Sequence, residues 1–279
     1  MLKDKLINNF ENIEKSEKFY INEKDYIKDG LVYCYKCNTP KQANCRALDR
    51  EWLMPALCEC QTIARDLEEK KRHEEETKRE IENMKNAGFA DHELKKFTFE
   101  ADDLKNEKIS KFSKNYAKDF KKYLKEGKGI LFFGDVGTGK TYFACAIANE
   151  LIEKGYTCHV TNFARVVNRV AATYDKQAII DSLNSYQILV IDDLAAERDT
   201  DYMNEIVWNV IDSRYRARKP IIITTNLTSS ELFNPVNVSK KRVYSRLLEM
   251  CIPVEVRGED RRKKELNKNL QYYDELLKG

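Results

Sequence analysis

The sequence predicts an α/β fold, a mostly parallel sheet flanked by helices, preceded by a small cysteine-rich domain and a charged connector helix. Three observations predict it. Short apolar runs alternate with amphipathic stretches from about residue 97, five of the eight cysteines lie within residues 34–60, and residues 62–86 are almost entirely polar. Strands that alternate with helices need crossover connections, which produce a parallel sheet covered on both faces.

Composition excludes several classes of protein. The chain has 279 residues, enough for about two domains, and its 49 basic and 46 acidic residues nearly balance. Any nucleic-acid binding must therefore depend on local patches. No run approaches the ~18 apolar residues of a membrane span, and the N-terminus has no apolar signal-peptide core. We expect a cytoplasmic protein with no membrane association, in which clustered cysteines indicate a metal site instead of disulfides.

The elements follow from the pattern of apolar residues. The expected strands are 129–134, 158–163, 186–194 and 221–226, and the expected helices are 141–155, 164–174 and 205–219. Residues 62–86 contain seven basic and eight acidic residues at helical spacing, which predicts a surface or bridging helix that ends near Gly88. The expected domains are 1–61 (cysteine-rich), 62–94 (connector helix and linker), 95–265 (α/β domain) and 266–279 (C-terminal tail).

The cysteine cluster has the spacing of a structural zinc site. Cys34 and Cys37 form one close pair, and Cys58 and Cys60 form another, so that four thiolates can surround one Zn²⁺. A segment with so few apolar residues needs the metal to fold. Cys45 could replace one ligand, and a reduced, metal-free cluster is the alternative. The other three cysteines have apolar neighbours and are expected to be buried: Cys145, Cys158 and Cys251.

A complete phosphate-binding motif follows the first expected strand of the α/β domain. Residues 134–141 read Gly-Asp-Val-Gly-Thr-Gly-Lys-Thr, between a strand and a helix as the motif requires. Its backbone amides and the helix N-terminus can bind nucleotide phosphates. Lys140 is expected to reach the β- and γ-phosphates of ATP, and Thr141 to hold Mg²⁺. The expected nucleotide contacts are Gly134, Asp135, Val136, Gly137, Thr138, Gly139, Lys140, Thr141 and Tyr142.

Three further polar residues are expected where the sheet strands end, beside the phosphate-binding motif. Asp192 and Asp193 end the buried strand 186–194, and ligands of such sheets collect at the carboxyl ends of the strands. We expect Asp192 to support Mg²⁺ and Asp193 to orient or deprotonate the attacking water. Asn226 ends the next strand and could hold that water, although Asn also caps strands for local reasons.

Four stretches together resemble the AAA+ ATPase of bacterial and phage DnaC/DnaI-type helicase loaders, a pattern shared by transposon-associated IstB ATPases. They are GDVGTGKTYFACAIANEL, ILVIDDLAAE, IDSRYRARKPIIITTNLTSSEL and KRVYSRLLEMC, within roughly residues 95–265. The resemblance implies that Lys140 and Thr141 are the Walker A pair, Asp192 and Asp193 the Walker B pair, Asn226 sensor 1 and Arg246 an arginine finger. Arg261 or Arg262 falls where sensor 2 is expected. Most AAA+ proteins have Glu in place of Asp193, and the resemblance to the loaders implies slow turnover with the shorter side chain.

The resemblance also implies assembly and DNA binding. An arginine finger acts on a neighbouring subunit, so hydrolysis is expected to require self-association. Arg165, Arg169 and Tyr174 lie where related initiator ATPases grip single-stranded DNA, and they offer two cations and an aromatic ring. A second basic region is either another DNA contact or a solvated helix end: Arg214, Arg216, Arg218 and Lys219.

The expected function is an ATP-dependent loader of the replicative hexameric helicase onto single-stranded DNA during DNA replication. The cysteine cluster resembles the N-terminal zinc domain of DnaI-like and phage loaders, which implies that this domain binds the helicase. One alternative is an IstB-like ATPase that regulates a transposase through DNA binding and remodelling, although such proteins usually lack a four-cysteine module. Another is a DNA-binding adaptor that binds ATP without hydrolysing it, against which the intact Lys140, Asp192 and Asp193 argue.

Overall fold

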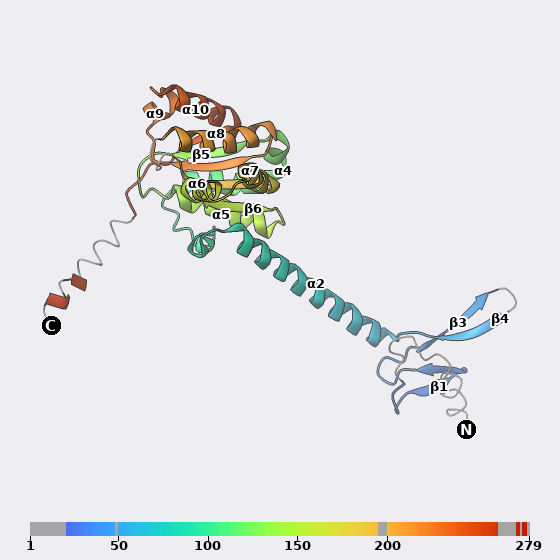
Figure 1. Cartoon of the computed structure of the whole chain (residues 1–279). Coiled ribbons are helices and arrows are strands. Elements are labelled where there is room, and N and C mark those ends of the chain that lie inside the picture. Colours follow the sequence, from blue (N-terminus) through green and yellow to red (C-terminus); the bar gives the residue numbers. More distant parts are fainter. Residues whose placement is uncertain (1–20, 48–49, 195–199, 262–271, 274, 278–279) are drawn as a thin grey trace. The chain divides into compact units, whose positions relative to one another are not determined.

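The computed structural model describes residues 21–47, 50–194, 200–261, 272–273 and 275–277 (Figure 1). The chain divides into two compact units, Met1–Lys78 and Arg79–Gly279. Among the described residues, no helix combines the length and the apolar character needed to cross a membrane.

The first unit is built from two small antiparallel hairpins. Strands β1 (Tyr26–Lys28) and β2 (Leu31–Tyr33) are joined at Asp29 and Gly30, which both have positive φ, as expected of an Asp-Gly hairpin turn. Strands β3 (Gln42–Ala47) and β4 (Arg50–Pro55) form the second hairpin.

The charged stretch forms a single helix, as its composition predicts. Helix α2 (Glu59–Gly88) is longer than the predicted segment at its N-terminal end and includes Cys60. It ends at Gly88, beside strand β6, where a Cβ atom would lie only 2.7 Å from the carbonyl oxygen of Cys158. Only glycine permits so close an approach between two backbones.

The second unit contains a five-stranded parallel sheet with the order β6-β7-β8-β5-β9. Its strands are β5 (Gly129–Phe133), β6 (Cys158–Asn162), β7 (Ile188–Leu194), β8 (Ile221–Thr225) and β9 (Cys251–Glu255). The predicted fold class is confirmed. Strand β9 was not predicted, and it adds an edge beside the strand that precedes the phosphate-binding motif.

The three helices predicted in this unit from their apolar periodicity are present as α5, α6 and α8, and the structure also contains helices that were not predicted. They are η1 (His92–Lys96), α3 (Glu107–Lys118), α4 (Phe120–Glu126), α5 (Lys140–Glu153), α6 (Phe163–Ala171), α7 (Lys176–Ser185), α8 (Asp201–Arg216), α9 (Ser229–Phe233) and α10 (Val238–Met250). Phe163, predicted to end a strand, begins α6, because the Asn162 side chain caps that helix by accepting the Arg165 N–H. The Thr200 side chain likewise caps α8, which starts before the predicted residue 205.

Two hydrophobic cores cover the two faces of the sheet, and successive strand residues alternate between them. Ile130 and Phe132 pack with α3, α4 and α5, whereas Leu131 and Phe133 pack with α6, α7, α8 and α10. Figure 1 shows this layered arrangement, with helices on both sides of β5. Because every central strand is buried on both faces, its carboxyl end is the part left accessible for chemistry.

Candidate functional site

The phosphate-binding loop lies between β5 and α5. Gly134, Gly137 and Gly139 all have positive φ, at 121°, 76° and 100°, and Gly139 is the N-cap of α5. At Gly137 a side chain is excluded twice, by the backbone angle and because a Cβ atom would lie 1.8 Å from the Asp260 carboxylate. The loop therefore needs glycine here, and its amides together with the α5 N-terminus form a site suited to phosphate.

Lys140 is held within this loop. Its side chain is almost fully buried, and its ammonium donates hydrogen bonds to the carbonyl oxygens of Gly134 at 2.9 Å and Asp135 at 2.5 Å. The Thr138 hydroxyl donates to the same Asp135 carbonyl. The loop thus folds around the lysine, which supplies a positive charge where phosphate oxygens can be bound.

Asp192 connects the loop to the neighbouring strand. Its Oδ1 atom accepts a hydrogen bond of 2.8 Å from the Thr141 hydroxyl, 51 residues earlier in the chain. It also accepts one of 2.5 Å from the Thr224 hydroxyl on β8. Burial raises the pKa of Asp192, and the two hydroxyl groups oppose that shift. A carboxylate and a hydroxyl oxygen in contact fit the oxygen-ligand preference of Mg²⁺.

Asp193 and Asn226 lie at the same edge of the sheet. Asp193 is exposed and has a positive φ of 56°, unusual for a residue other than glycine. Asn226 is also exposed and directly follows β8. Since β7, β8 and β5 are neighbours in a parallel sheet, their carboxyl ends meet. The fold therefore brings together five residues singled out from the sequence: Lys140, Thr141, Asp192, Asp193 and Asn226.

A segment after β9 also contacts the loop. The Arg261 N–H donates to the Gly137 carbonyl at 3.0 Å, and the Arg261 guanidinium pairs with Asp103 at 3.2 Å. Arg261 is thus beside the phosphate loop, whereas Arg262 lies outside the described residues. The sequence pattern does not single out Asp103, because its partner Arg261 is far away in the chain.

Tyr142, a predicted nucleotide contact, is engaged by the segment that precedes α3. Its hydroxyl donates to the Thr98 carbonyl, and its ring lies 5.4 Å from that of Phe97. Burial, followed by the charge of Asp102, raises the pKa of Tyr142 to about 12. Asp135 and Val136 are exposed at the tip of the loop.

Arg246 lies on α10 and is held against α8. It pairs with Asp212, and its guanidinium carbon lies 4.2 Å from the Trp208 ring centroid and 4.9 Å from that of Tyr215. Its side chain is 26% exposed. These ring and ion-pair partners were missed because they depend on how two helices pack.

The predicted DNA contacts differ in their surroundings. Arg165 donates to the Ala90 carbonyl, so part of its guanidinium is already engaged. Arg169 is exposed on α6, and Tyr174, between α6 and α7, is completely exposed. The second basic region is not a continuous surface patch, since Arg214 is fully buried. Both interpretations of Arg214, as a DNA contact and as a solvated helix end, are therefore wrong.

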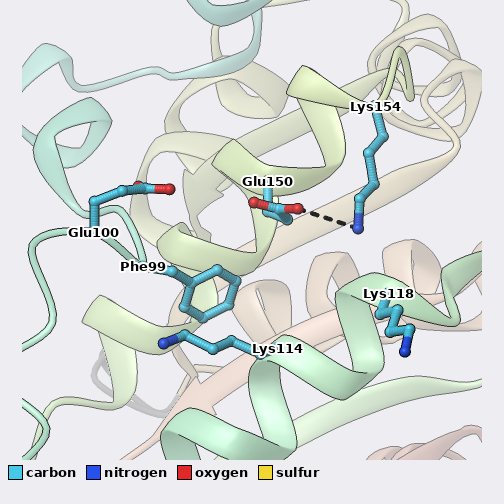
Figure 2. A pocket seen from close by; sticks show the side chains of 6 residues that line it. All are labelled: Phe99, Glu100, Lys114, Lys118, Glu150 and Lys154. Carbon is cyan, nitrogen blue, oxygen red and sulfur yellow. Dashed lines mark ion pairs between the residues drawn. The ribbon is translucent and has the colours of Figure 1, made fainter.

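A hollow of about 490 Å³ lies elsewhere in this unit (Figure 2). Glu150 and Lys154, an ion pair of 3.1 Å on α5, line one side, and Lys114 lies over the Phe99 ring. Lys154 is fourteen residues beyond Lys140, which is about 20 Å along a helix. This hollow is therefore separate from the phosphate loop.

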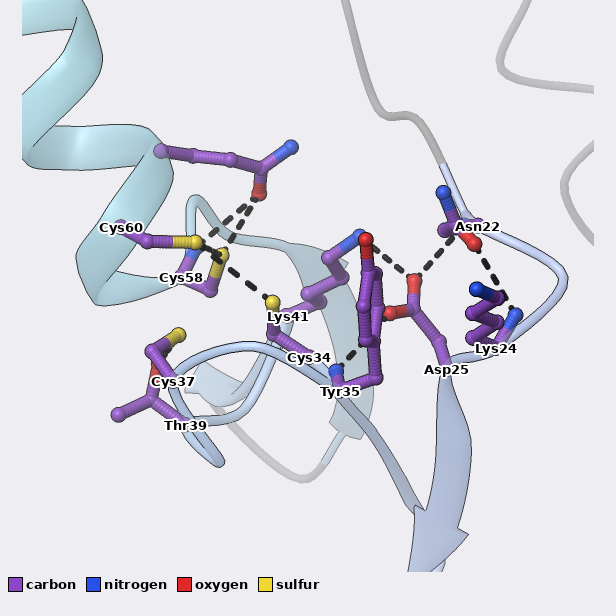
Figure 3. Close-up of polar contacts among 11 residues, drawn as sticks. Asn22, Lys24, Asp25, Cys34, Tyr35, Cys37, Thr39, Lys41, Cys58 and Cys60 are labelled. Atoms are coloured by element: carbon purple, nitrogen blue, oxygen red, sulfur yellow. Dashed lines mark hydrogen bonds and ion pairs between the residues drawn. The ribbon is translucent and has the colours of Figure 1, made fainter.

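The four predicted zinc ligands form a cluster in the first unit (Figure 3). Their sulfur atoms all lie within 4.8 Å of one another, with 3.6 Å between Cys34 and Cys60 and 3.4 Å between Cys58 and Cys60. Zn–S bonds of about 2.3 Å in a tetrahedral site place sulfur atoms about 3.8 Å apart, so the residues present fit Zn²⁺. Cys45 lies on β3 and is not a member of the cluster.

Local hydrogen bonds position the cluster. Asn38 has a positive φ and donates its N–H to the Cys34 carbonyl, which turns the chain between Cys34 and Cys37. Beside this turn, the Asp25 carboxylate pairs with Lys41 at 2.6 Å, and both side chains are buried (Figure 3). Asp25 also accepts the Tyr35 N–H. The buried ion pair therefore anchors the turn that carries two of the thiols.

The thiols are unequal in acidity. A hydrogen bond with the Thr39 hydroxyl lowers the pKa of Cys37 to about 6. The contact with Cys58, followed by burial, raises the pKa of Cys60 to about 12. Crowded thiolates repel one another unless a cation neutralises them, which is what a closed zinc site supplies. The three remaining cysteines are buried, as predicted: Cys145, Cys158 and Cys251.

Comparison with known proteins agrees with this geometry. A family model described as IstB-like ATP binding protein matches residues 42–269. The replicative helicase loader DnaI of Bacillus subtilis (strain 168) is 26% identical over 280 residues, which cover 94% of this chain and 84% of that protein. The replicative helicase loader DnaC of Escherichia coli (strain K12) is 26% identical over 136 residues, which cover 46% of this chain and 54% of that protein. The chain thus spans about half the length of DnaC.

Solved structures share the fold. A crystal structure of DnaI has a TM-score of 0.53 at 21% identity and covers 63% of this chain and 96% of that one. A crystal structure of the DnaC helicase loader has a TM-score of 0.54 at 24% identity and covers 60% of this chain and 100% of that one. At such identities the likeness concerns the α/β fold alone. From the family match over most of its length, the chain belongs to the IstB-like ATP-binding proteins.

Proposed function

We propose that this protein is an ATP-dependent loader of a replicative DNA helicase and that it hydrolyses ATP at the carboxyl ends of the sheet strands. The observation that carries the ATPase proposal is the hydrogen bond between Thr141 and Asp192, which joins the phosphate loop to the acidic strand end. Mg²⁺, held by these two residues, would neutralise charge that develops on the β- and γ-phosphates. The neighbouring side chains would bind the phosphates and position the attacking water.

Each neighbouring residue has a distinct role in this proposal. Lys140 binds the β- and γ-phosphates, and the location of its ammonium within the loop, beside the Gly134 carbonyl, supports this role. Asp193 orients or deprotonates the attacking water, which its exposure allows, and Asn226 holds that water. Arg261 provides a cation beside the loop as sensor 2.

Hydrolysis in this proposal requires self-association. Arg246 acts on the nucleotide of a neighbouring subunit, where a guanidinium stabilises charge in the transition state. To do so it must leave Asp212 and the aromatic rings on α8. The nucleotide state and the assembly state would then be coupled, since only an assembled pair completes the site.

The zinc cluster and the DNA contacts complete the proposal. The first unit, folded around structural Zn²⁺, binds the hexameric helicase; the match to DnaI over 94% of this chain, which includes the cysteine region, supports this assignment. Arg169 and Tyr174 contact single-stranded DNA by phosphate pairing and base stacking, and Arg165 does so with the part of its guanidinium that Ala90 does not engage.

The proposal is tested by mixing the full chain with replicative helicases of candidate hosts and phages, with and without ATP. Mass measurement should detect a complex that forms through residues 1–61, and the helicase should appear on single-stranded DNA only when ATP is present. A Cys58→Ser variant serves as the control for the zinc-dependent unit. Absence of any complex with every helicase tested would refute the loader function and leave the ATPase proposal standing.

A transposase regulator is the second candidate, because the matching family is described by its IstB-like members. That function would require ATP-dependent binding to a transposase and to double-stranded DNA. The four-cysteine cluster favours the loader, since it supplies a separate unit for a protein partner. Stimulation of a transposase encoded beside this gene would reverse the preference.

A further inference from the structure

The register between strands β7 and β8 shifts at Asp192 and Asp193. Ile191 pairs with Ile223, but the next paired residues are Leu194 and Thr225. Strand β7 therefore advances three residues while β8 advances two, which is a β-bulge that contains Asp192 and Asp193. The positive φ of Asp193 belongs to this bulge. A bulge changes the direction of the side chains in the strand. This bulge lets two consecutive residues, Asp192 and Asp193, take part in the same site at the carboxyl ends of the strands.

A single hydroxyl group lies opposite the bulge. Thr224 is fully buried, donates its hydroxyl hydrogen to Asp192 Oδ1 at 2.5 Å, and accepts the Asp193 N–H at 2.9 Å. The bulge removes the Asp193 N–H from the regular ladder, so the hydroxyl replaces its lost partner. One side chain thus orients the first carboxylate and fixes the backbone of the second.

We propose that Thr224 is a positioning residue that sets the orientation of Asp192 and Asp193 for Mg²⁺ binding and water activation. This inference rests on the proposed function, since it concerns the same ATPase site. The sequence pattern does not reveal this role, because it identifies Thr224 only as a residue of the strand that precedes Asn226. Its effect is exerted through the two aspartates, and it need not touch the nucleotide.

The chain offers a matched control at the next residue. Thr225 is equally buried on β8, and its hydroxyl also makes two hydrogen bonds, donating to the Leu194 carbonyl at 2.8 Å and accepting the Leu227 N–H at 3.2 Å. It contacts neither aspartate side chain in the part of the chain that is described. Thr→Val at either position keeps the shape and removes two buried hydrogen bonds, so general damage to the strand should be similar.

The experiment compares four full-length proteins: wild type, Thr224→Val, Thr224→Ser and Thr225→Val. Nucleotide affinity is measured by calorimetry in EDTA and in Mg²⁺, and ATP turnover is measured separately. In EDTA, Thr224→Val should bind ATP with the affinity of wild type. The factor by which Mg²⁺ increases ATP affinity should be about tenfold smaller in this variant, and kcat should fall more than KM changes. Thr224→Ser should retain both properties, because it keeps the hydroxyl. Thr225→Val should keep the Mg²⁺ gain and the turnover of wild type, although it should lose as much thermal stability as Thr224→Val.

Two outcomes would overturn the inference: equal Mg²⁺ gains in Thr224→Val and wild type, or equal losses in Thr224→Val and Thr225→Val. Should the valine variant not fold, Thr224→Ala provides the same comparison, with thermal unfolding as the check. Failure of the proposed function has a different signature. In that case the wild type itself would show no Mg²⁺-dependent nucleotide affinity or turnover.

Discussion

Replacing Arg214 with Met should lower the free energy of unfolding of the second unit by about 3–5 kcal/mol. Arg214 lies near the C-terminal end of α8, and its side chain is fully buried. Its guanidinium donates to the carbonyl oxygens of Tyr186 at 2.8 Å, Gln187 at 3.2 Å and Pro220 at 2.5 Å. These carbonyls precede β7 and β8, so the arginine fixes the starts of two central strands.

The magnitude follows from this contact set. A hydrogen bond to a charged donor contributes about 1.5–3 kcal/mol, so three of them would amount to roughly 5–9 kcal/mol. Burying the guanidinium charge in the protein interior costs several kcal/mol, which offsets part of this gain and leaves about 3–5 kcal/mol. Met fills a similar volume with a flexible chain but donates no hydrogen bond, so the carbonyl groups lose their partners.

The assay is urea denaturation followed by tryptophan fluorescence. The chain has two tryptophans, Trp52 in the first unit and Trp208 in the second, so a Trp52→Phe background reports on the second unit alone. Arg216→Met is the control, because that side chain is 76% exposed and its ion pair with Asp212 should contribute less than about 1 kcal/mol. A loss below about 1 kcal/mol for Arg214→Met, or equal losses in both variants, would show that the hydrogen bonds of Arg214 do not stabilise the second unit.

Three further experiments test the nucleotide loop, the arginine finger and the zinc site. Lys140→Ala should reduce nucleotide affinity by about 100-fold or more, measured by calorimetry, because a charge-assisted contact to phosphate is lost; retained micromolar affinity would contradict the loop assignment. Arg246→Ala should keep nucleotide binding but remove the rise of specific activity with protein concentration, and unchanged turnover would exclude the finger role. A chelator should release one zinc per chain, measured with a colorimetric indicator, and unfold the first unit. Cys58→Ser should prevent zinc loading whereas Cys45→Ser should not, and equal behaviour of the two would disprove the ligand set.

Local signals were enough to predict the centre of the site. The strand before Gly134 and the four residues of β7 that precede Asp192 are continuous apolar runs, buried on both faces, and such runs are visible without tertiary information. The glycines of the loop are equally local, since their positive φ angles are a property of the turn itself. The spacing of the cysteines likewise predicted a cluster whose sulfur atoms do lie close together.

Long-range packing explains most of what was missed. Strand β9 lies at the edge of the sheet and contains Pro253, which weakens its strand pattern. Arg214 reads as a solvated cation at a helix end, and only the convergence of β7 and β8 beneath α8 buries it. Thr224 acquires its role from a register shift between two strands, which no single-strand pattern reveals.

The most direct test of the proposed ATPase site is calorimetric titration of ATP into the full chain, with Mg²⁺ and with EDTA. We expect one site per chain, with Mg²⁺ strengthening the binding in wild type and failing to do so in Asp192→Asn. That pattern depends on the contact between Thr141 and Asp192 at the end of the sheet. If well-folded wild-type protein gives no heat of binding, or if Mg²⁺ strengthens binding equally in both proteins, the proposed site is wrong.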